Sequence, residues 1–536
     1  MIHQLARSCQ VFTAVTWPDW SFNLLFYSTL LLLSVLLFPL FLSSAASASP
    51  LSAAPPPPSS SPPFRRFQAR YLSVYAVVML ADWMQGTHMY TLYLSYGASI
   101  STLFLTGFLS GAVFAPFLGS AVDKAGRMRS CVVYCLLEIA INCMESVNSM
   151  PVLLAGRVLG GISTNLLFTA FESWMTTEHR SRGYPDEWLA DTYSRTSVIN
   201  GATAVLAGIV AQALEEQLGQ IGPFHGAVAL TVLALFMIVA MWDENYGESS
   251  DSDLSLSGYR QFRAQFKEGW SATLSNRQIM VVGLTQALSE GAMYTFVFMW
   301  VPTLMGVAPT AVPTGVVFSA LMISITLGGL TFPYIAAGFR TPEAAATFTY
   351  GLAAAAMLVP TLCLSSDNDC FLPVLGSFML VEFAVGSFMP AAAKMRSTYV
   401  PDNLQGAILN IFRLPLNFFV VVGTKMSDSW STVWVYRAVC AWFFAAALLQ
   451  YTLVGGSEAA GKKKPEKKVA AKKAAVKTTP AKPRGRSKSP APAKSTKSPA
   501  RTKTPARTKT PARSKSPAPT KFSPRATRSS RKPKRS

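Results

Sequence analysis

Long apolar segments recur along most of this chain, and they restrict its fold more than any other feature of the sequence. Each is about 20 residues long, which as a helix crosses a hydrocarbon layer of about 30 Å. Because that layer holds no water, the backbone must satisfy its own hydrogen bonds, as an α-helix does within one segment. Half of the residues are apolar and only 14% are charged. The sequence therefore predicts an all-α membrane protein.

Twelve of these segments form the predicted core, and one further segment, Ser21–Leu42, precedes it. The core spans are predicted at Ala69–Tyr93, Ser99–Val122, Ser130–Ser146, Pro151–Met175, Asp191–Ala213, Gly222–Met241, Ile279–Leu304, Val312–Gly338, Ala344–Leu364, Phe371–Ala393, Leu404–Thr424 and Val433–Gly455. A polar stretch from Trp242 to Gln278 separates the sixth span from the seventh. We therefore expect two halves of six helices each.

Basic residues in the predicted loops fall almost entirely on one side of the core. That side carries Arg65, Arg66, Arg70, Lys124, Arg127, Arg129, Arg180, Arg182, Arg260, Arg263, Lys267, Arg277, Arg340, Lys394 and Arg396, whereas the other side carries Lys425 alone. Loops rich in Lys and Arg stay in the cytoplasm during membrane insertion. Both ends of the core, and the C-terminal tail, are therefore predicted to be cytoplasmic.

The first apolar segment resembles a secretory signal peptide, and the small residues Ala46 and Ala48 would suit a cleavage site. Its removal would leave the Arg65 and Arg66 cluster outside the cell, against the charge bias. We therefore expect this segment to be retained as an extra N-terminal transmembrane helix, with cleavage as the alternative.

Most of the net charge of +21 comes from the end of the chain. The segment from Gly461 to Ser536 holds 27 of the 48 Lys and Arg residues and one acid, Glu466, so the preceding part is slightly acidic. Its repeats, such as KSPA and RTKTPA, contain too few apolar residues to fold. We expect a disordered tail that contacts anionic lipids or cytosolic partners. Nucleic-acid binding is the less favoured interpretation, because the tail is tethered to a membrane.

These patterns predict six regions along the chain. They are an apolar N-terminal segment at 1–43, a Pro/Ser-rich linker at 44–66, a six-helix half at 67–241, a cytoplasmic loop at 242–278, a second six-helix half at 279–456 and a basic tail at 457–536.

Internal repeats relate the two halves. The pattern RS-x-x-x-PD occurs at Arg180–Asp186 and again at Arg396–Asp402. The first and seventh spans each carry an acid near mid-span, Asp82 or Glu290, shortly before Met-Tyr-Thr. Repeated halves with a site at their interface are typical of transporters that alternate access between the two sides of a membrane.

A charged turn follows the second core span. Its sequence, GSAVDKAGRMR (Gly119–Arg129), resembles the signature of the major facilitator superfamily, in which glycines allow a tight turn between helices. Asp123 and Arg127 are then available for ion pairs that depend on conformation. We assign this conformational motif to Gly119, Asp123, Gly126 and Arg127.

Further segments resemble one branch of that superfamily, the molybdate-anion transporters. They include ADWMQG and YTLY within Ala81–Tyr93, GRVLGGISTNLLFTAFESW from Gly156, QALSE and FVFMWVP within Gln286–Pro302, and GAILNIFRLPLN at Gly406–Asn417. The resemblance covers both halves. It implies a major facilitator fold with an extra apolar segment at the N-terminus, and secondary active uptake of the tetrahedral dianion molybdate. The alternatives are transport of sulfate, another anion or an organic solute, and a membrane scaffold that transports nothing.

Three arginines lie inside predicted spans, where a charge is costly and indicates function or a partner. Arg195 and Arg413 lie at similar depths of the fifth and eleventh spans, so two guanidinium groups could converge on an oxyanion from opposite halves. We expect them to form an anion clamp, with Asn410, Asn417 and Gln85 adding hydrogen bonds. The alternative is that each arginine neutralises a buried carboxylate, and this is the favoured role of Arg157.

Four acids are candidates for coupling transport to protons: Asp82, Glu290, Glu172 and Glu382. Importing a dianion against about 100 mV costs about 4.6 kcal/mol, so an energy source is required. Asp82 and Glu290 are the best candidates because they are equivalent in the repeat. The alternative, slightly favoured, is that these acids pair with the arginines.

No pattern typical of an enzyme occurs. The sequence contains no Walker-type phosphate loop, no HExxH and no GxSxG, and its four histidines and seven cysteines lack metal-ligand spacing. We therefore expect no enzymatic activity, no cofactor and no metal site. The prediction is a multi-pass protein of the plasma membrane, with an endomembrane as the alternative.

Overall fold

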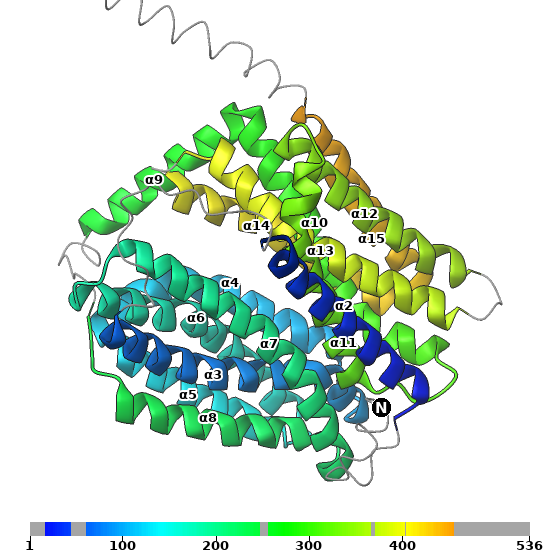
Figure 1. Ribbon diagram of the computed structural model, residues 1–536, viewed down its shortest axis with the longest axis horizontal. Coiled ribbons are helices and arrows are strands. Elements are labelled where there is room, and N and C mark those ends of the chain that lie inside the picture. The colour runs from blue at the N-terminus through cyan, green and yellow to red at the C-terminus, as the bar shows by residue number, and fades with distance from the viewer. Residues whose placement is uncertain (1–16, 44–60, 247–255, 366–369, 402–403, 455–536) are drawn as a thin grey trace, which may run out of the picture. The chain divides into compact units, whose positions relative to one another are not determined.

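The computed structural model describes residues 17–43, 61–246, 256–365, 370–401 and 404–454, all of which belong to one unit of the chain, Met1–Lys468. Within these ranges the regular structure is helical. The helices are α2 (Asp19–Ser43), α3 (Pro62–Ser95), α4 (Ile100–Ala125), α5 (Arg127–Met144), α6 (Met150–Ser181), α7 (Asp186–Leu218), α8 (Gly222–Met241), α9 (Leu256–Ser275), α10 (Arg277–Val307), α11 (Thr314–Ala337), α12 (Pro342–Cys363), α13 (Phe371–Tyr399), α14 (Gln405–Ser429) and α15 (Thr432–Tyr451) (Figure 1).

Two groups of six helices make up the bundle. In the first half, α3 packs against α7 and α8, α4 against α6, and α5 against α6 and α8. In the second half, α10 packs against α13, α14 and α15, while α12 packs against α13 and α15, and α11 against α13. Figure 1 shows the first half from blue to teal and the second from green to orange. The predicted division into six plus six core helices is confirmed.

Each half buries its own set of aromatic side chains. In the second half the rings of Phe296 and Phe378 meet edge to face, with 5.0 Å between centroids. In the first half Trp174 stacks on Trp242 with 3.9 Å between centroids, which fixes the end of α8 against α6. Such rings supply much of the packing energy inside a helix bundle. The halves therefore have separate cores.

Nine helices in the described ranges are long and apolar enough to cross a membrane: α2, α6, α7, α8, α11, α12, α13, α14 and α15. The other core helices, α3, α4, α5 and α10, pack among them. Three of these four carry a mid-span acid, Asp82, Glu138 or Glu290, which lowers their hydropathy. The chain is therefore a multi-pass membrane protein.

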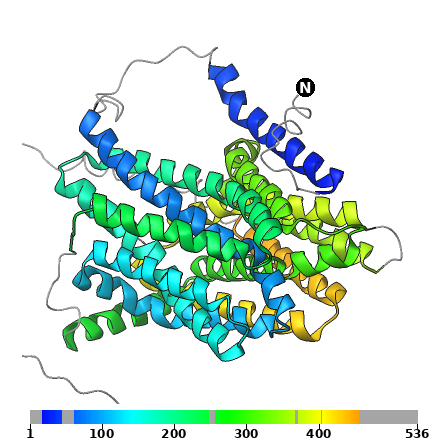
Figure 2. The ribbon, with the colours of Figure 1, turned by 90° about the horizontal axis from the view of Figure 1, so that it is seen from below.

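The extra N-terminal helix, α2, lies against α11 on the outside of the bundle (Figure 2). Trp20 holds it there: its indole N–H donates to Thr310 Oγ1 at 3.2 Å, and its ring packs on Phe371 at 4.8 Å. Trp17 also donates a hydrogen bond to the Glu216 carboxylate of α7. The thirteenth helix predicted from the sequence is thus present.

The stretch between the halves is not the plain loop that its polar composition predicts. It contains α9, which packs against α14 and α10. Phe266 and Trp270, one turn apart, stack at 6.4 Å on this helix. Apolar residues spaced by one turn within a polar sequence are typical of an amphipathic helix on a bundle surface.

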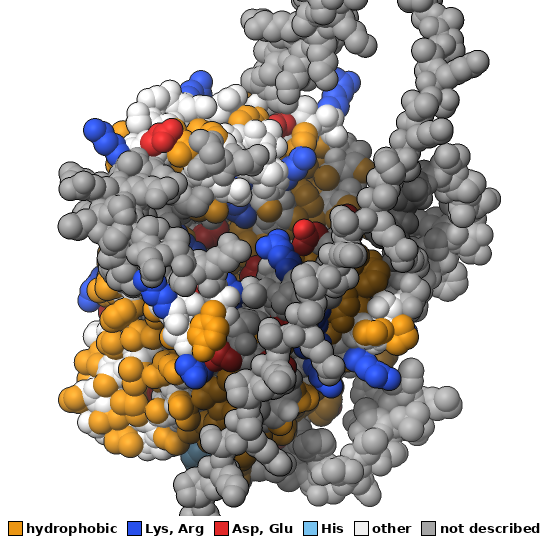
Figure 3. Space-filling model, turned by 90° about the vertical axis from the view of Figure 1, so that its left-hand side faces the viewer, with side chains coloured by type: hydrophobic (Ala, Val, Ile, Leu, Met, Phe, Trp, Pro, Cys, Tyr) orange, Lys and Arg blue, Asp and Glu red, His pale blue; other side chains and the backbone are white. Residues whose placement is uncertain are grey.

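The turns α4–α5, α6–α7 and α13–α14 lie at one end of the bundle, which we call the basic end because it carries residues such as Lys124, Arg129, Arg182 and Lys394. Figure 3 shows Lys and Arg side chains spread over this face, which is recessed between the two halves. We call the opposite end the far end.

Candidate functional site

A cavity of about 700 Å³ separates the two halves. Helices α3, α4, α5 and α6 line it from the first half, and α10 and α14 from the second, with Phe266 of α9 at its edge. Six of the residues predicted from the sequence line this cavity: Asp82, Gln85, Arg157, Asn410, Arg413 and Asn417. The cavity therefore contains acidic, basic and amide side chains, which can bind an ionic solute.

Arg413 is the cation of the second-half wall. It lies about 12 Å along α14 from the helix start at Gln405, with its side chain exposed to the cavity. Asn410 and Asn417 stand three residues before and four residues after it, so all three share one helix face. Among the described residues, no carboxylate lies within ion-pair distance of this guanidinium.

The facing wall depends on a close approach of α4 and α6. A Cβ on Gly161 would lie 2.7 Å from Ser110 Oγ, so only glycine fits at this crossing. Asn165 donates from Nδ2 to the carbonyl oxygens of Gly111 at 2.9 Å and of Gly161 at 2.8 Å. Asn165 was not predicted as a site residue, and its only signal in the sequence is a polar side chain one turn beyond GRVLGG.

Glu138 is a second site residue outside the set predicted from the sequence. Its carboxylate is buried and accepts hydrogen bonds from Gln85 Nε2 at 2.8 Å and from Ser163 Oγ at 2.6 Å. Asp82 lies one turn before Gln85 on α3 and lines the same cavity. The first-half wall thus carries two acids, and Gln85 donates to one of them, Glu138.

Arg157 is held by a network inside the first half. It forms an ion pair with Glu145, 2.7 Å between Nη2 and Oε1, and the same oxygen accepts from the Tyr93 hydroxyl at 2.8 Å. A second nitrogen, Nη1, contacts Met89 Sδ at 3.0 Å. Glu145 is only 1% exposed. This arrangement agrees with the neutralising role favoured for Arg157, although its side chain also reaches the cavity.

Arg195 does not share the cavity with Arg413, in contrast to the predicted clamp. Its Nε donates to Asp191 Oδ2 at 2.9 Å, one turn earlier on α7, and its side chain is 55% exposed. The depth of Arg195 in its span gives no information on which face of α7 carries it. The arginine that lies across the cavity from Arg413 is Arg157.

Of the predicted coupling acids, only Asp82 lines the cavity. Glu290 lies one turn before Tyr294, a lining residue of α10, and near Gln286, which accepts a hydrogen bond from Arg396 at 3.1 Å. Glu172 is exposed and accepts from the Tyr193 hydroxyl at 3.1 Å. Glu382 is buried in the second half, away from the cavity lining.

Contacts between the halves are concentrated toward the far end. Ser101 at the start of α4 donates to the Asp428 carboxylate at the end of α14. The amide of Gly315 on α11 donates to Gln212 Oε1 on α7 at 3.0 Å. Phe104, one turn after Ser101 on α4, packs against Phe298 with 5.2 Å between ring centroids.

At the basic end, by contrast, no hydrogen bond or ion pair joins the halves within the described ranges. The far-end contacts close the cavity toward the far end, and its lining extends toward the basic end, where it reaches Phe266 of α9 and Asn410 near the start of α14.

The charged turn after α4 ties four helices together at the basic end. Arg127 pairs with Asp123 at 2.7 Å and also donates to Thr177 of α6. Gly126 has a φ of +101°, which favours glycine, and a Cβ there would lie 2.6 Å from the Glu244 carboxylate.

The Glu244 carboxylate, three residues after the end of α8, accepts from the backbone amides of Met128 at 2.9 Å and Arg129 at 3.0 Å, which caps the start of α5. Gly119 lies on α4 one turn before Asp123.

Comparisons with known proteins agree with this architecture. Residues 51–381 match a family described as sugar transporters with 12 transmembrane helices. A molybdate-anion transporter of Xenopus tropicalis is 32% identical over 399 residues, which is 72% of this chain and 85% of that protein. A molybdate-anion transporter of Danio rerio is 32% identical over 383 residues, 67% of this chain and 79% of that protein.

Solved structures with similar folds are also transporters. A mutant form of the nucleoside transporter NupG has a TM-score of 0.58 at 12% identity, covering 72% of this chain and 100% of that one. A peptide transporter of the POT family in complex with sulfate has a TM-score of 0.58 at 13% identity, covering 74% of this chain and 95% of that one. The fold and the relatives together show that this chain belongs to the molybdate-anion transporter family of the major facilitator superfamily.

Proposed function

We propose that this protein carries molybdate into the cell by alternating access, and that Arg413 is the group that binds the anion. The observation that carries this proposal is an exposed guanidinium in the cavity between the halves, with no carboxylate partner among the described residues. A guanidinium stays charged and presents five donors in one plane, which suits a tetrahedral oxyanion. The names of the relatives supply molybdate as the anion.

Neighbouring amides would complete the binding site. Asn410 and Asn417 share the α14 face with Arg413, and their side-chain amides can donate to the remaining oxygens of the anion. Arg157 adds positive potential from the opposite wall, but Glu145 balances most of it. Arg413 is therefore the main source of attraction.

Protons are the proposed source of coupling. Asp82 and Glu138 lie in the same cavity as Arg413, so in their charged forms they would repel a dianion. Protonation of these acids before the anion binds removes that repulsion and makes anion and proton movement interdependent. Uptake should then be faster when the outside solution is more acidic.

The charge of the loops supports an orientation with the basic end in the cytoplasm. In that orientation the cavity opens inward, and the basic C-terminal tail lies beside the anionic lipids of the cytoplasmic leaflet or contacts cytosolic partners. The plasma membrane is the proposed location, because uptake from outside requires it.

The test is molybdate accumulation in cells that lack their own high-affinity uptake. Wild type, Arg413→Gln and Arg195→Gln are compared at equal surface expression, each with and without excess sulfate or a sugar as competitor. We expect Arg413→Gln to lose uptake at least tenfold and Arg195→Gln to retain it. The two-arginine clamp predicts loss in both variants, whereas a sugar that competes as well as molybdate would favour an organic solute.

Absence of molybdate uptake by surface-expressed wild type would refute the substrate assignment, and full uptake by folded Arg413→Gln would refute the role of Arg413.

A further inference from the structure

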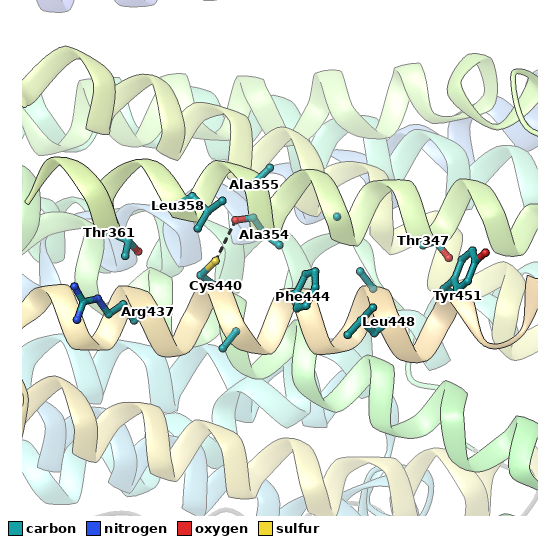
Figure 4. Close-up of a pocket in the computed structure, with 13 residues that line it drawn as sticks. Thr347, Ala354, Ala355, Leu358, Thr361, Arg437, Cys440, Phe444, Leu448 and Tyr451 are labelled. Carbon is teal, nitrogen blue, oxygen red and sulfur yellow. Dashed lines mark hydrogen bonds between the residues drawn. The ribbon is translucent and has the colours of Figure 1, made fainter.

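An apolar groove of about 740 Å³ runs between α12 and α15 at the outer edge of the second half (Figures 1 and 4). Small residues, among them Gly351 and Ala355 of α12 and Ala441 of α15, form its floor. Large exposed side chains, including Leu358, Phe444 and Leu448, form its rims. The sulfur of Cys440 donates to the Ala354 carbonyl at 3.3 Å and joins the two helices beneath the groove.

One charged side chain, Arg437, lies at the end of this groove. Figure 4 shows Arg437 and Thr361 at one end and Tyr451 and Thr347 at the other. Arg437 is exposed, and its guanidinium stands 4.5 Å from the ring of Trp434, one turn earlier on α15. Within the described ranges no carboxylate pairs with it.

A guanidinium on the lipid-facing side of a span, without a carboxylate partner among the described residues, calls for an anionic ligand or access to the headgroup region. Arg437 stands about 7.5 Å along α15 from the helix start at Thr432, at the far end of the bundle. Its side chain can therefore extend to the level of the lipid phosphates. Trp434 at the same level is typical of a membrane interface.

We propose that the groove is a binding site for one glycerophospholipid, with its phosphate on Arg437 and an acyl chain along the floor. The distance from Arg437 to Tyr451 along α15 is about 21 Å, more than the roughly 15 Å depth of one leaflet. A groove of that length accommodates an extended acyl chain. The charge lies only at the end where the phosphate would be, and between the polar side chains at its two ends the lining is apolar.

The test uses the purified full-length protein, stripped of lipid in detergent and then incubated with phosphatidylglycerol, with bound lipid counted by native mass spectrometry. Arg437→Gln removes the phosphate partner. Gly351→Phe fills the groove, because a Cβ at Gly351 has no heavy atom within 4 Å and the ring can extend into open space. Lys425→Gln, which removes an exposed far-end charge on α14 outside the groove, is the matched control.

We expect wild type and Lys425→Gln to retain one lipid more than Arg437→Gln and Gly351→Phe. All variants should elute as wild type in size-exclusion chromatography. If Arg437→Gln misfolds, Arg437→Lys takes its place: it keeps the positive charge and should bind part of the wild-type amount of lipid. Retention of the full lipid count by folded Gly351→Phe would overturn the proposal. Full retention of the lipid by folded Arg437→Gln would also overturn it, because Arg437 would then not hold the phosphate.

Discussion

The ion pair of Arg157 with Glu145 gives a prediction that separates a structural arginine from a substrate-binding one. Replacing Arg157 by Gln leaves Glu145, 1% exposed, as an unpaired carboxylate at 2.8 Å from the Tyr93 hydroxyl. Breaking a buried pair in this way costs about 3–5 kcal/mol. Arg157 itself is 12% exposed and lines the cavity between the halves, so we expect a loss near the lower limit, about 3 kcal/mol.

The assay is reversible unfolding of the purified variants in mixed detergent micelles, followed by uptake measurements. Arg157→Gln should unfold at a lower denaturant concentration than wild type. The double variant Arg157→Gln with Glu145→Gln removes both charges and should recover most of the lost stability, as a double-mutant cycle measures. The double variant should also transport molybdate. If Arg157→Gln is as stable as wild type and yet transports nothing, Arg157 binds the anion and our assignment is wrong.

Further predictions concern the ends of the bundle and of the chain. Gly126→Ala should cost about 1–3 kcal/mol, because φ there is +101° and a Cβ would meet the Glu244 carboxylate, and a melting temperature equal to that of wild type would contradict this. Asp428→Asn should weaken the far-end closure by about 1 kcal/mol and so increase labelling of a cysteine at Ala112 from the far side about fivefold, and unchanged labelling would exclude this contact as part of the gate. Truncation after Gly461 should leave uptake intact, whereas loss of uptake would give the tail an essential role. An N-terminal epitope should remain on the mature protein and be accessible from outside, and its absence would indicate cleavage of the first segment.

The number and grouping of the core helices could be predicted because each span must be long and apolar to cross a membrane. Helix α9 was missed because it lies outside the apolar spans, where a polar amphipathic sequence resembles a loop. Helix α7 begins at Asp186, five residues before the predicted Asp191, because helices continue past the apolar layer into polar sequence that hydropathy does not register. Hydropathy therefore predicts spans better than helix ends.

The candidate site was predictable in part for a related reason. Counting residues along a span gives the depth of an ionisable group, and this selected both Arg413 and Arg195. Which face of the helix turns inward depends on packing between helices, and the two arginines differ in that respect: Arg413 lines the cavity and Arg195 pairs with Asp191. Glu145 lies at the end of its span, so nothing in the sequence identifies it as the partner of Arg157.

The most direct test of the central claim is molybdate binding to the purified protein, measured by isothermal titration calorimetry in wild type and in Arg413→Gln. We predict saturable binding by wild type and an affinity at least tenfold lower in the variant, equivalent to about 1.4 kcal/mol or more, with both proteins equally folded. Equal affinities in the two proteins would contradict the account, because the anion would then be bound elsewhere than at the Arg413 guanidinium.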